Sequence, residues 1–266
     1  MTVRRRVVRH DTTHGTTSAR PDSLAVEEPL EIRLAGRPFS VTMRTPGHDI
    51  DLAIGFLVGE GVVAAADDVA SVQAMGAAVD VRLAPHVPPP DPSLERHVFT
   101  TSACGVCGSA SLEAVDKVAR FDVAVDDVRV EPAVLASLPD TLREAQAAFA
   151  STGGVHAAGL FTADGELVVL REDVGRHNAV DKVVGWALRE GRLPLAGHVL
   201  QVSGRASFEL VQKARLAGVP LLTAVSAPSS LAVELAADAG MTLVGFSRQG
   251  RFTVYTGERR VTGLGG

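Results

Sequence analysis

The chain contains two cysteines, Cys104 and Cys107, which stand three positions apart. Gly105 and Gly108 flank them, and glycine allows the backbone open and left-handed conformations. No apolar run anchors the segment, so we expect an accessible loop at the start of a helix. Unpaired N–H groups at a helix start favour the thiolate form of cysteine. An exposed thiolate can react in turn with two different partners.

Four interpretations of the cysteine pair compete: a thioredoxin-like redox pair, half of a zinc site, a sulfur-carrying thiol with a helper, and two inert cysteines. The pair follows a proline-rich stretch, residues 85–92, instead of an early strand of a βαβ unit, which weakens the redox interpretation. A four-cysteine zinc site would need a second cysteine pair, which the sequence does not contain. His156 is also not followed by the glutamate that zinc deaminases place two positions on. We expect no metal, and the residues alone do not choose among the remaining alternatives.

Polar residues gather where predicted strands pass into predicted helices, in residues 171–182 and 203–207. The carboxyl ends of parallel strands meet at one edge of a sheet, where ligands usually bind. Free N–H groups at the helix starts can hold phosphate. The alternative is ordinary helix capping on a solvated surface. The candidate pocket residues are Asp173, Arg176, His177, Ser203, Arg205 and Ser207.

A further polar stretch ends the next predicted strand. Phe246 can stack on a base, while Arg248 and Arg251 can pair with phosphates. The competing interpretation is a tight hairpin with solvent-exposed arginines. The candidate ligand-binding stretch comprises Phe246, Ser247, Arg248, Gln249, Gly250 and Arg251.

The elements that must position these groups follow from the apolar pattern. Strands are predicted at 155–161, 166–170, 198–202, 220–225, 241–246 and 252–256, with helices at 178–189, 208–217 and 231–239 between them. Continuous apolar strands alternating with helices predict an α/β three-layer sandwich with a mixed, largely buried sheet. Upstream, a hairpin at 30–34 and 39–43, a helix at 48–59 and a strand at 79–83 indicate a smaller N-terminal α+β region. Residues 109–121 and 132–149 are predicted helices.

This pattern divides the chain into a flexible arm (1–23), an N-terminal α+β region (24–95) and an α/β domain (96–266) that begins with the cysteine loop. A formal net charge of −5 gives no electrostatic case for a nucleic-acid or membrane protein. We find neither a signal peptide nor an apolar stretch of membrane-spanning length, and we expect a cytoplasmic protein. Paired cysteines in a reducing compartment are more typical of chemistry than of a structural disulfide.

An ordered set of short motifs runs from about residue 27 to about residue 256. The chain thereby resembles the formate dehydrogenase accessory sulfurtransferase family, which acts in molybdenum-cofactor maturation. One such motif would be weak evidence, but the complete set in this order is highly specific. The motifs are residues 44–49 with 55–57, 104–108, 153–158, 172–182, 203–207, 225–227 and 243–246.

The resemblance implies a cytidine-deaminase-like core and a homodimer. It implies that Cys104 carries a persulfide charged by a cysteine desulfurase, and that Cys107 assists. The sulfur passes to the bis-molybdopterin guanine dinucleotide cofactor, which is then inserted into formate dehydrogenase. The family's cofactor-binding stretch falls on residues 246–251, whereas the pocket walls at 172–182 and 203–207 are our inference from position. The alternative is a cofactor-binding chaperone without thiol chemistry.

Overall fold

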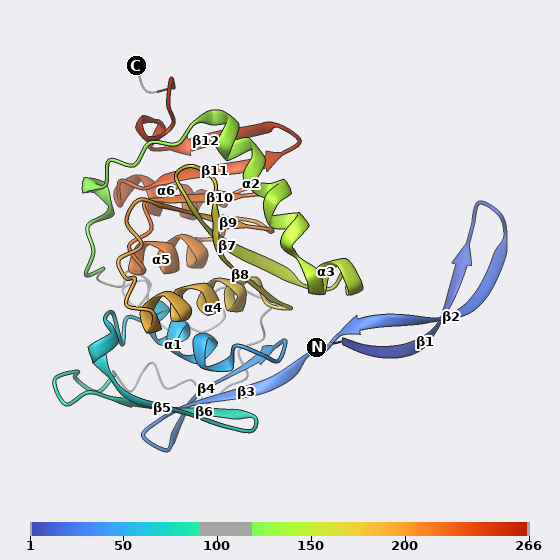
Figure 1. Ribbon diagram of the computed structural model, residues 1–266, viewed down its shortest axis with the longest axis horizontal. Helices are drawn as coiled ribbons and strands as arrows, with labels where there is room; N and C mark the ends of the chain where they lie inside the picture. Colours follow the sequence, from blue (N-terminus) through green and yellow to red (C-terminus); the bar gives the residue numbers. More distant parts are fainter. Residues whose placement is uncertain (1, 91–118, 265–266) are drawn as a thin grey trace.

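The computed structural model describes residues 2–90 and 119–264, and its centre is a mixed six-stranded sheet (Figure 1). The strand order is β12-β11-β10-β9-β7-β8. Strands β9, β10 and β11 are parallel, whereas β7 runs antiparallel to both β8 and β9, and β12 runs antiparallel to β11. The strands are β7 (His156–Thr162), β8 (Leu167–Asp173), β9 (His198–Val202), β10 (Leu221–Ala224), β11 (Thr242–Arg248) and β12 (Arg251–Thr256).

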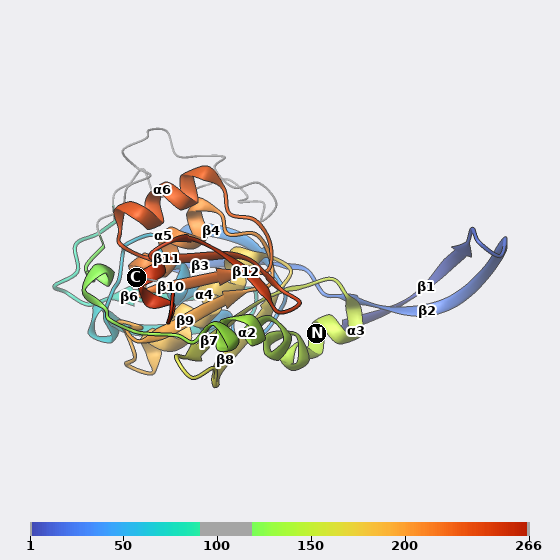
Figure 2. The same ribbon diagram turned by 90° about the horizontal axis from the view of Figure 1, so that it is seen from above.

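Helices cover both faces of this sheet, as the predicted three-layer sandwich requires (Figures 1 and 2). Helix α2 (Pro132–Ala145) packs on one face, where Leu135, Leu138 and Leu142 join one core cluster. Helices α4 (Arg176–Arg189), α5 (Phe208–Leu216) and α6 (Ser230–Asp238) lie on the other face, within a second cluster. Successive side chains of a strand point to opposite faces. The apolar runs therefore supply both clusters.

The N-terminal region is a four-stranded sheet in the order β4-β3-β6-β5, packed on helix α1 (Asp49–Gly59). The predicted hairpin, helix and third strand are confirmed as β3 (Glu28–Leu34), β4 (Arg37–Arg44), α1 and β6 (Ala78–Leu83). Strand β5 (Val69–Met75) escaped the sequence analysis because it is an edge strand with mostly exposed side chains. One core cluster runs without a break from this sheet through α1 to α4.

Two glycines let helices α1 and α4 approach backbone to backbone. A Cβ atom on Gly55 would lie 1.8 Å from the Asp181 carbonyl oxygen, and one on Gly185 would lie 1.8 Å from the Asp51 carbonyl oxygen. No side chain fits at either position. This contact fixes the N-terminal region against the six-stranded sheet.

The predicted flexible arm is a regular β-hairpin, formed by β1 (Thr2–Asp11) and β2 (Thr16–Ala25). The sequence analysis predicted no strands in this arm. Most side chains on both faces of the hairpin are exposed, so its sequence lacks the polar and apolar alternation by which strands are recognised. The hairpin projects from the body beside α3 (Ala147–Thr152), as Figures 1 and 2 show.

The remaining differences are local. The helix predicted at 132–149 is two helices, because Gln146 leaves the helical conformation at φ −78° and ψ 86°. Short 3-10 turns occupy Ala66–Asp68, Val123–Val125 and Glu258–Arg260. Most of the helix predicted at 109–121 lies outside the described residues, and 119–121 are not helical. Among the helices described, none has the length and apolar character needed to cross a membrane.

Candidate functional site at the carboxyl edge of the sheet

The polar strand–helix junctions meet at one edge of the six-stranded sheet, as expected. The Ala157 N–H donates to Ser203 Oγ (2.9 Å), the Ser226 N–H to the Gly204 carbonyl (3.2 Å) and the Phe246 N–H to the Ser226 carbonyl (3.2 Å). Three successive junctions are therefore bonded side by side. Because β7 is antiparallel, its first residue reaches the same edge.

A pocket of about 540 Å³ opens at this edge, between the end of α2 and the strand termini. Of the predicted ligand-binding residues, Ser203 and Arg248 line it. Sequence reasoning missed the contribution of α2 and α3, because no motif marks those helices. The pocket is lined by Pro139, Asp140, Leu142, Arg143, Gln146, Phe149, Gly153, Gly154, Val155, His156, Val174, Ser203, Val225 and Arg248.

The α2 end of the pocket contributes polar groups of two kinds. The Arg143 guanidinium lies over the Phe149 ring, 4.0 Å from its centroid. The Gln146 side chain is buried, yet its amide nitrogen has no hydrogen-bond partner within the described chain. A buried amide without a partner costs free energy unless a ligand or water satisfies it. The Gln146 amide is therefore a donor available to a bound molecule.

His156 places a titratable ring in the same pocket. Burial lowers the pKa of His156, and the nearby charges of Arg176 and His177 lower it further. The imidazole is therefore neutral at pH 7 and can accept or donate a hydrogen bond. The cations around it favour anionic ligands.

The N-termini of α4 and α5 lie next to each other at this edge. His177 Nε2 is 3.3 Å from Ser207 Oγ and 2.9 Å from the Glu209 carboxylate, so a side chain of α4 connects to the start of α5. Neither helix has a side-chain cap on its first N–H groups. Arg205 is exposed and shortly precedes α5, and Arg176 Nε, at the start of α4, is buried without a described partner. Uncapped helix starts beside arginines suit phosphate groups.

Residues 246–251 form the β11–β12 hairpin. Gln249 and Gly250 have φ values of 53° and 71°, which fit the mirror-image turn that two-residue hairpins favour. Phe246 lies at a register shift with φ 52° and is 40% exposed. A bulky residue rarely adopts this left-handed conformation, and strained residues cluster at ligand sites. The structure has the tight hairpin with exposed Arg248 and Arg251, and Phe246 of the same hairpin is exposed as well.

Two predicted ligand residues have buried side chains, which is a correction. Ser247 is 0% exposed, and its hydroxyl donates to the Leu135 carbonyl beneath α2 (3.3 Å). Asp173 is also 0% exposed, and its carboxylate pairs with Lys182 (2.7 Å). Strand alternation turns Ser247 inward, and the Lys182 ammonium holds Asp173. Both side chains are bound to other parts of the protein and support the edge from within.

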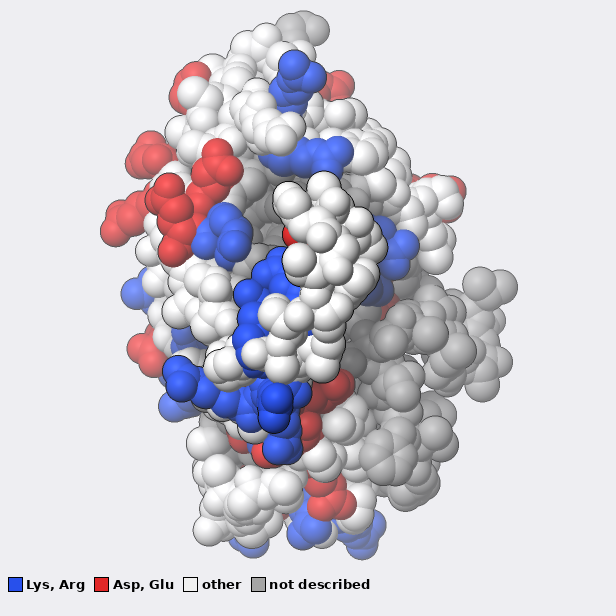
Figure 3. All heavy atoms as spheres, turned by 90° about the vertical axis from the view of Figure 1, so that its right-hand side faces the viewer, with Lys and Arg blue, Asp and Glu red and all other residues white. Residues whose placement is uncertain are grey.

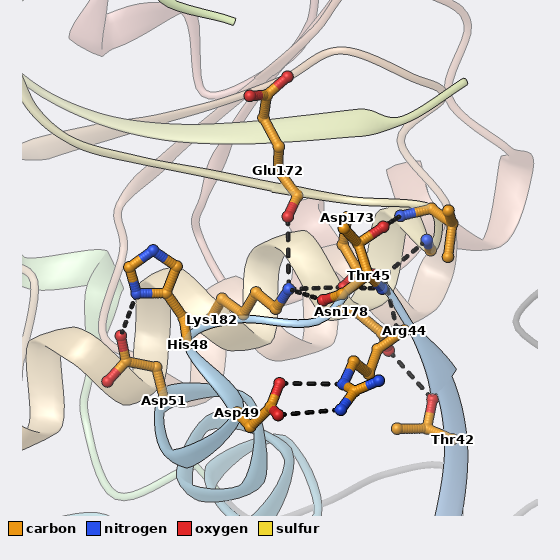
Figure 4. Close-up of polar contacts among 12 residues, drawn as sticks. Thr42, Arg44, Thr45, His48, Asp49, Asp51, Glu172, Asp173, Asn178 and Lys182 are labelled. Atoms are coloured by element: carbon orange, nitrogen blue, oxygen red, sulfur yellow. Dashed lines mark hydrogen bonds and ion pairs between the residues drawn. The ribbon is translucent and has the colours of Figure 1, made fainter. Parts of the chain in front are cut away.

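The loop after β4 is tied to this edge from the N-terminal region (Figure 4). The Thr45 N–H donates to Asp173 (3.0 Å), and the Thr45 carbonyl accepts from Lys182 (2.8 Å). Arg44 makes two 3.0 Å bonds to the Asp49 carboxylate at the start of α1. These contacts explain why the motif at 44–49 accompanies the motif at 172–182.

The two cysteines predicted to do the chemistry, Cys104 and Cys107, lie outside the described residues. Within the described part, Asp67, Asp68 and His86 bring possible metal ligands within 4.8 Å of one another. Asp68 already accepts from the Ala64 and Ala65 N–H groups and pairs with Arg120. That cluster is accounted for as a capped turn.

The fold and edge define an α/β protein with a pocket at the carboxyl ends of its strands, lined by two arginines, one aspartate and a histidine among its polar groups. The model of the FdhD/NarQ family matches residues 25–262, and the chain belongs to that family.

Proteins called sulfur carrier protein FdhD are similar to this chain over most of its length. The protein from Streptomyces avermitilis is 58% identical over 98% of this chain and 96% of its own. That from Mycobacterium tuberculosis is 56% identical over 91% of this chain and 93% of its own. A solved structure from Desulfotalea psychrophila, described as a formate dehydrogenase accessory protein, aligns with a TM-score of 0.78 at 26% identity, covering 98% of this chain and 99% of that one.

Proposed function

We propose that this protein is a sulfurtransferase that carries persulfide sulfur on Cys104. It takes the sulfur from a cysteine desulfurase and delivers it to the bis-molybdopterin guanine dinucleotide cofactor required by formate dehydrogenase. The observation that carries the proposal is the pocket at the carboxyl edge, with Arg143 and Arg248 in its lining, in a chain of the FdhD/NarQ family. A phosphate-bearing cofactor needs such a pocket, whereas a protein that passed sulfur only between proteins would not.

The two cysteines balance one round of sulfur transfer, and an external dithiol resets them. The Cys104 thiolate attacks the outer sulfur of the desulfurase persulfide, a new S–S bond forms, and the desulfurase cysteine leaves as a thiolate. Cys107 then attacks the inner sulfur of the Cys104 persulfide. This step forms a disulfide and releases sulfide to the cofactor, so the cysteine pair supplies the two electrons. A cellular dithiol must afterwards reduce the disulfide.

The described edge supplies groups for the nucleotide half of the cofactor. Phe246 offers a ring for stacking on the base, and Arg248 and Arg251 offer guanidinium groups for the phosphates. The uncapped starts of α4 and α5 lie along the same edge. Ser203, Arg205, Ser207, Arg176 and His177 remain candidate pocket residues on this basis.

The proposal extends to cellular location, partner proteins and oligomeric state. We infer a cytoplasmic protein that meets both the desulfurase and formate dehydrogenase, and a homodimer whose core descends from a cytidine-deaminase-like fold. Antiparallel β7 beside parallel β9, β10 and β11 supports a mixed-sheet core of this kind.

The deciding experiment is intact-protein mass spectrometry after incubation with a cysteine desulfurase and cysteine. Wild type is expected to gain one sulfur atom, and Cys104→Ala to gain none. Cys107→Ala is the matched control, because it retains the carrier thiol and loses only the assisting one. It should still accept sulfur and should fail to release it.

A non-covalent cofactor chaperone is the alternative that the same pocket supports. It predicts no mass gain in wild type with active desulfurase. It also predicts full formate dehydrogenase activity in a strain whose only copy is Cys104→Ala. Either result would overturn sulfur transfer while leaving the pocket assignment intact.

A further inference from the structure

The N-terminal hairpin is basic, whereas the rest of the chain is acidic. Residues 2–25 contain five arginines and two aspartates, a net charge of +3. The whole chain carries −5, so the remainder carries −8. The hairpin also precedes the part of the chain that the family model matches, which begins at residue 25.

The pairing register divides the hairpin charges unequally between its two faces. Arg4 is paired with Ser23, Arg6 with Pro21 and Val8 with Ala19, and paired residues share a face. The ten residues of this face include no acid, and we call it the cationic face. It comprises Thr2, Arg4, Arg6, Val8, His10, Thr17, Ala19, Pro21, Ser23 and Ala25.

On the opposite face, two aspartates offset most of the positive charge of the arginines. Arg5 is paired with Asp22, and Asp11 follows further along the same face. Arg9 and Arg20 add two further cations there. The two faces therefore differ in the presence of acids, although both contain arginine.

The hairpin is incomplete as an isolated unit. It is a sheet of two strands, and such ribbons are marginally stable alone. Val8 on the cationic face is 71% exposed. Ten residues per strand give a reach of about 33 Å. Within the described chain, no hydrogen bond or ion pair given by the structure joins residues 2–24 to the body, and the hairpin points away from it (Figures 1 and 2).

The body presents an acidic surface on the side from which the hairpin projects. Its residues come from the start and outer side of α2 and from the β7–β8 turn, which packs against α2 at Val134 and Leu138. Within 131–145 and 164–166, Arg143 is the one basic residue. Figure 3 shows acidic side chains gathered at the upper left of this side. The exposed acids of this acidic surface are Glu131, Asp140, Glu144, Asp164 and Glu166.

Resting on the homodimer of the proposed function, we propose that its two copies meet through the hairpins, the cationic face of each docking on the acidic surface of the other. The exchange is reciprocal, so each copy gives one hairpin and receives one, as a two-fold symmetric dimer requires. Two cationic faces would repel each other, which excludes a face-to-face contact between hairpins. The hairpin direction excludes its own acidic surface. Docking pairs the arginines of one surface with the acids of the other and covers Val8.

The test is sedimentation equilibrium of the full chain over a range of concentrations and salt. Wild type should be a dimer that dissociates more readily as salt rises. Arg4→Glu with Arg6→Glu should raise the dimer dissociation constant at least about tenfold, because attraction becomes repulsion at both contacts. The matched control is Arg5→Glu with Arg9→Glu, which makes the same charge change on the opposite face. It should cause a clearly smaller shift.

A charge swap tests whether the acidic surface of the partner receives the hairpin. Glu144→Lys with Glu166→Lys alone should also weaken the dimer. Mixing it with the Arg4→Glu/Arg6→Glu variant should restore a heterodimer, because one exchanged contact is then attractive with reversed charges and the other is the wild-type contact. A monomeric wild type, or a dimer equally sensitive to both hairpin variants, would overturn the proposal. An acidic protein of another kind would then become the occupant to seek.

Discussion

The carboxylate of Asp173 and the ammonium of Lys182 lie 2.7 Å apart with 0% and 1% of their side chains exposed. Asp173 ends strand β8, Lys182 lies on α4, and both bind the backbone of Thr45. This pair connects the candidate pocket edge to the N-terminal region. Because the pair is buried, removing only one of the two charges should cost much free energy of unfolding.

We expect Lys182→Met to lower the free energy of unfolding by about 3–5 kcal/mol, because it leaves the buried Asp173 carboxylate without its cation. Chemical denaturation measures the loss. Adding Asp173→Asn should recover part of it. The partly exposed pair of Arg33 and Glu31 provides the control, since Arg33→Met should cost about 1 kcal/mol or less. Equal losses at the two pairs would contradict this account.

Gly185→Ala should destabilise the protein by about 3 kcal/mol or more, because the new methyl group would meet the Asp51 carbonyl oxygen at 1.8 Å. Backbone cannot move aside as a side chain can. The control is Gly154→Ala, whose new methyl group would meet the Ala25 side chain at an ordinary 3.7 Å. Thermal unfolding of the two variants compares them directly. A well-tolerated Gly185→Ala would show that α1 and α4 can separate.

Phe246→Asn should weaken binding of guanosine diphosphate about tenfold while changing stability by less than about 1 kcal/mol. Stacking on a base contributes about 1–3 kcal/mol. Asn adopts the left-handed conformation at less cost than Phe, which offsets the loss of a ring that is only partly buried. Calorimetry gives the affinity, and a thermal melt gives the stability. Unchanged affinity would remove Phe246 from the site.

Arg251→Ala and Arg248→Ala should each weaken the binding of guanosine diphosphate. The loss of affinity should shrink with added salt, because the contacts are charge-assisted. Arg37→Ala is the matched control: it removes an equally exposed arginine from β4 in the other sheet. Affinity unchanged in both hairpin variants would mean that these arginines only face solvent.

The stability of the protein should fall as pH drops below the ordinary histidine pKa of about 6.5. Burial lowers the pKa of both His156 and His48 in the folded chain. The unfolded chain therefore binds protons first, and unfolding becomes easier as pH falls. Above that pH both states are neutral and the effect vanishes. His156→Gln should flatten the slope between about pH 7 and pH 5 in denaturation series, and an unchanged slope would contradict the assignment.

The sequence by itself determined most of the six-stranded sheet. Long apolar runs such as those of β9 and β10 are buried on both faces, so local pattern and final environment agree. The ordered motifs likewise identified the family, and the strand–helix junctions identified the edge. What local pattern could not reveal was strand β5 and the hairpin β1–β2. Their side chains remain largely exposed, so no alternation distinguishes them from loops.

Only the tertiary structure decided which polar residues line the pocket and which are buried. Asp173 and Ser247 have the same character in sequence as Ser203 and Arg248, yet the first two are buried by neighbours distant in the chain. Gln146 lines the pocket because helices α2 and α3 meet at this residue, and no sequence motif predicts that junction. The sequence supplied the chemical groups and their local periods. The packing of distant elements determined which groups remained accessible, because burial depends on contacts that sequence spacing does not encode.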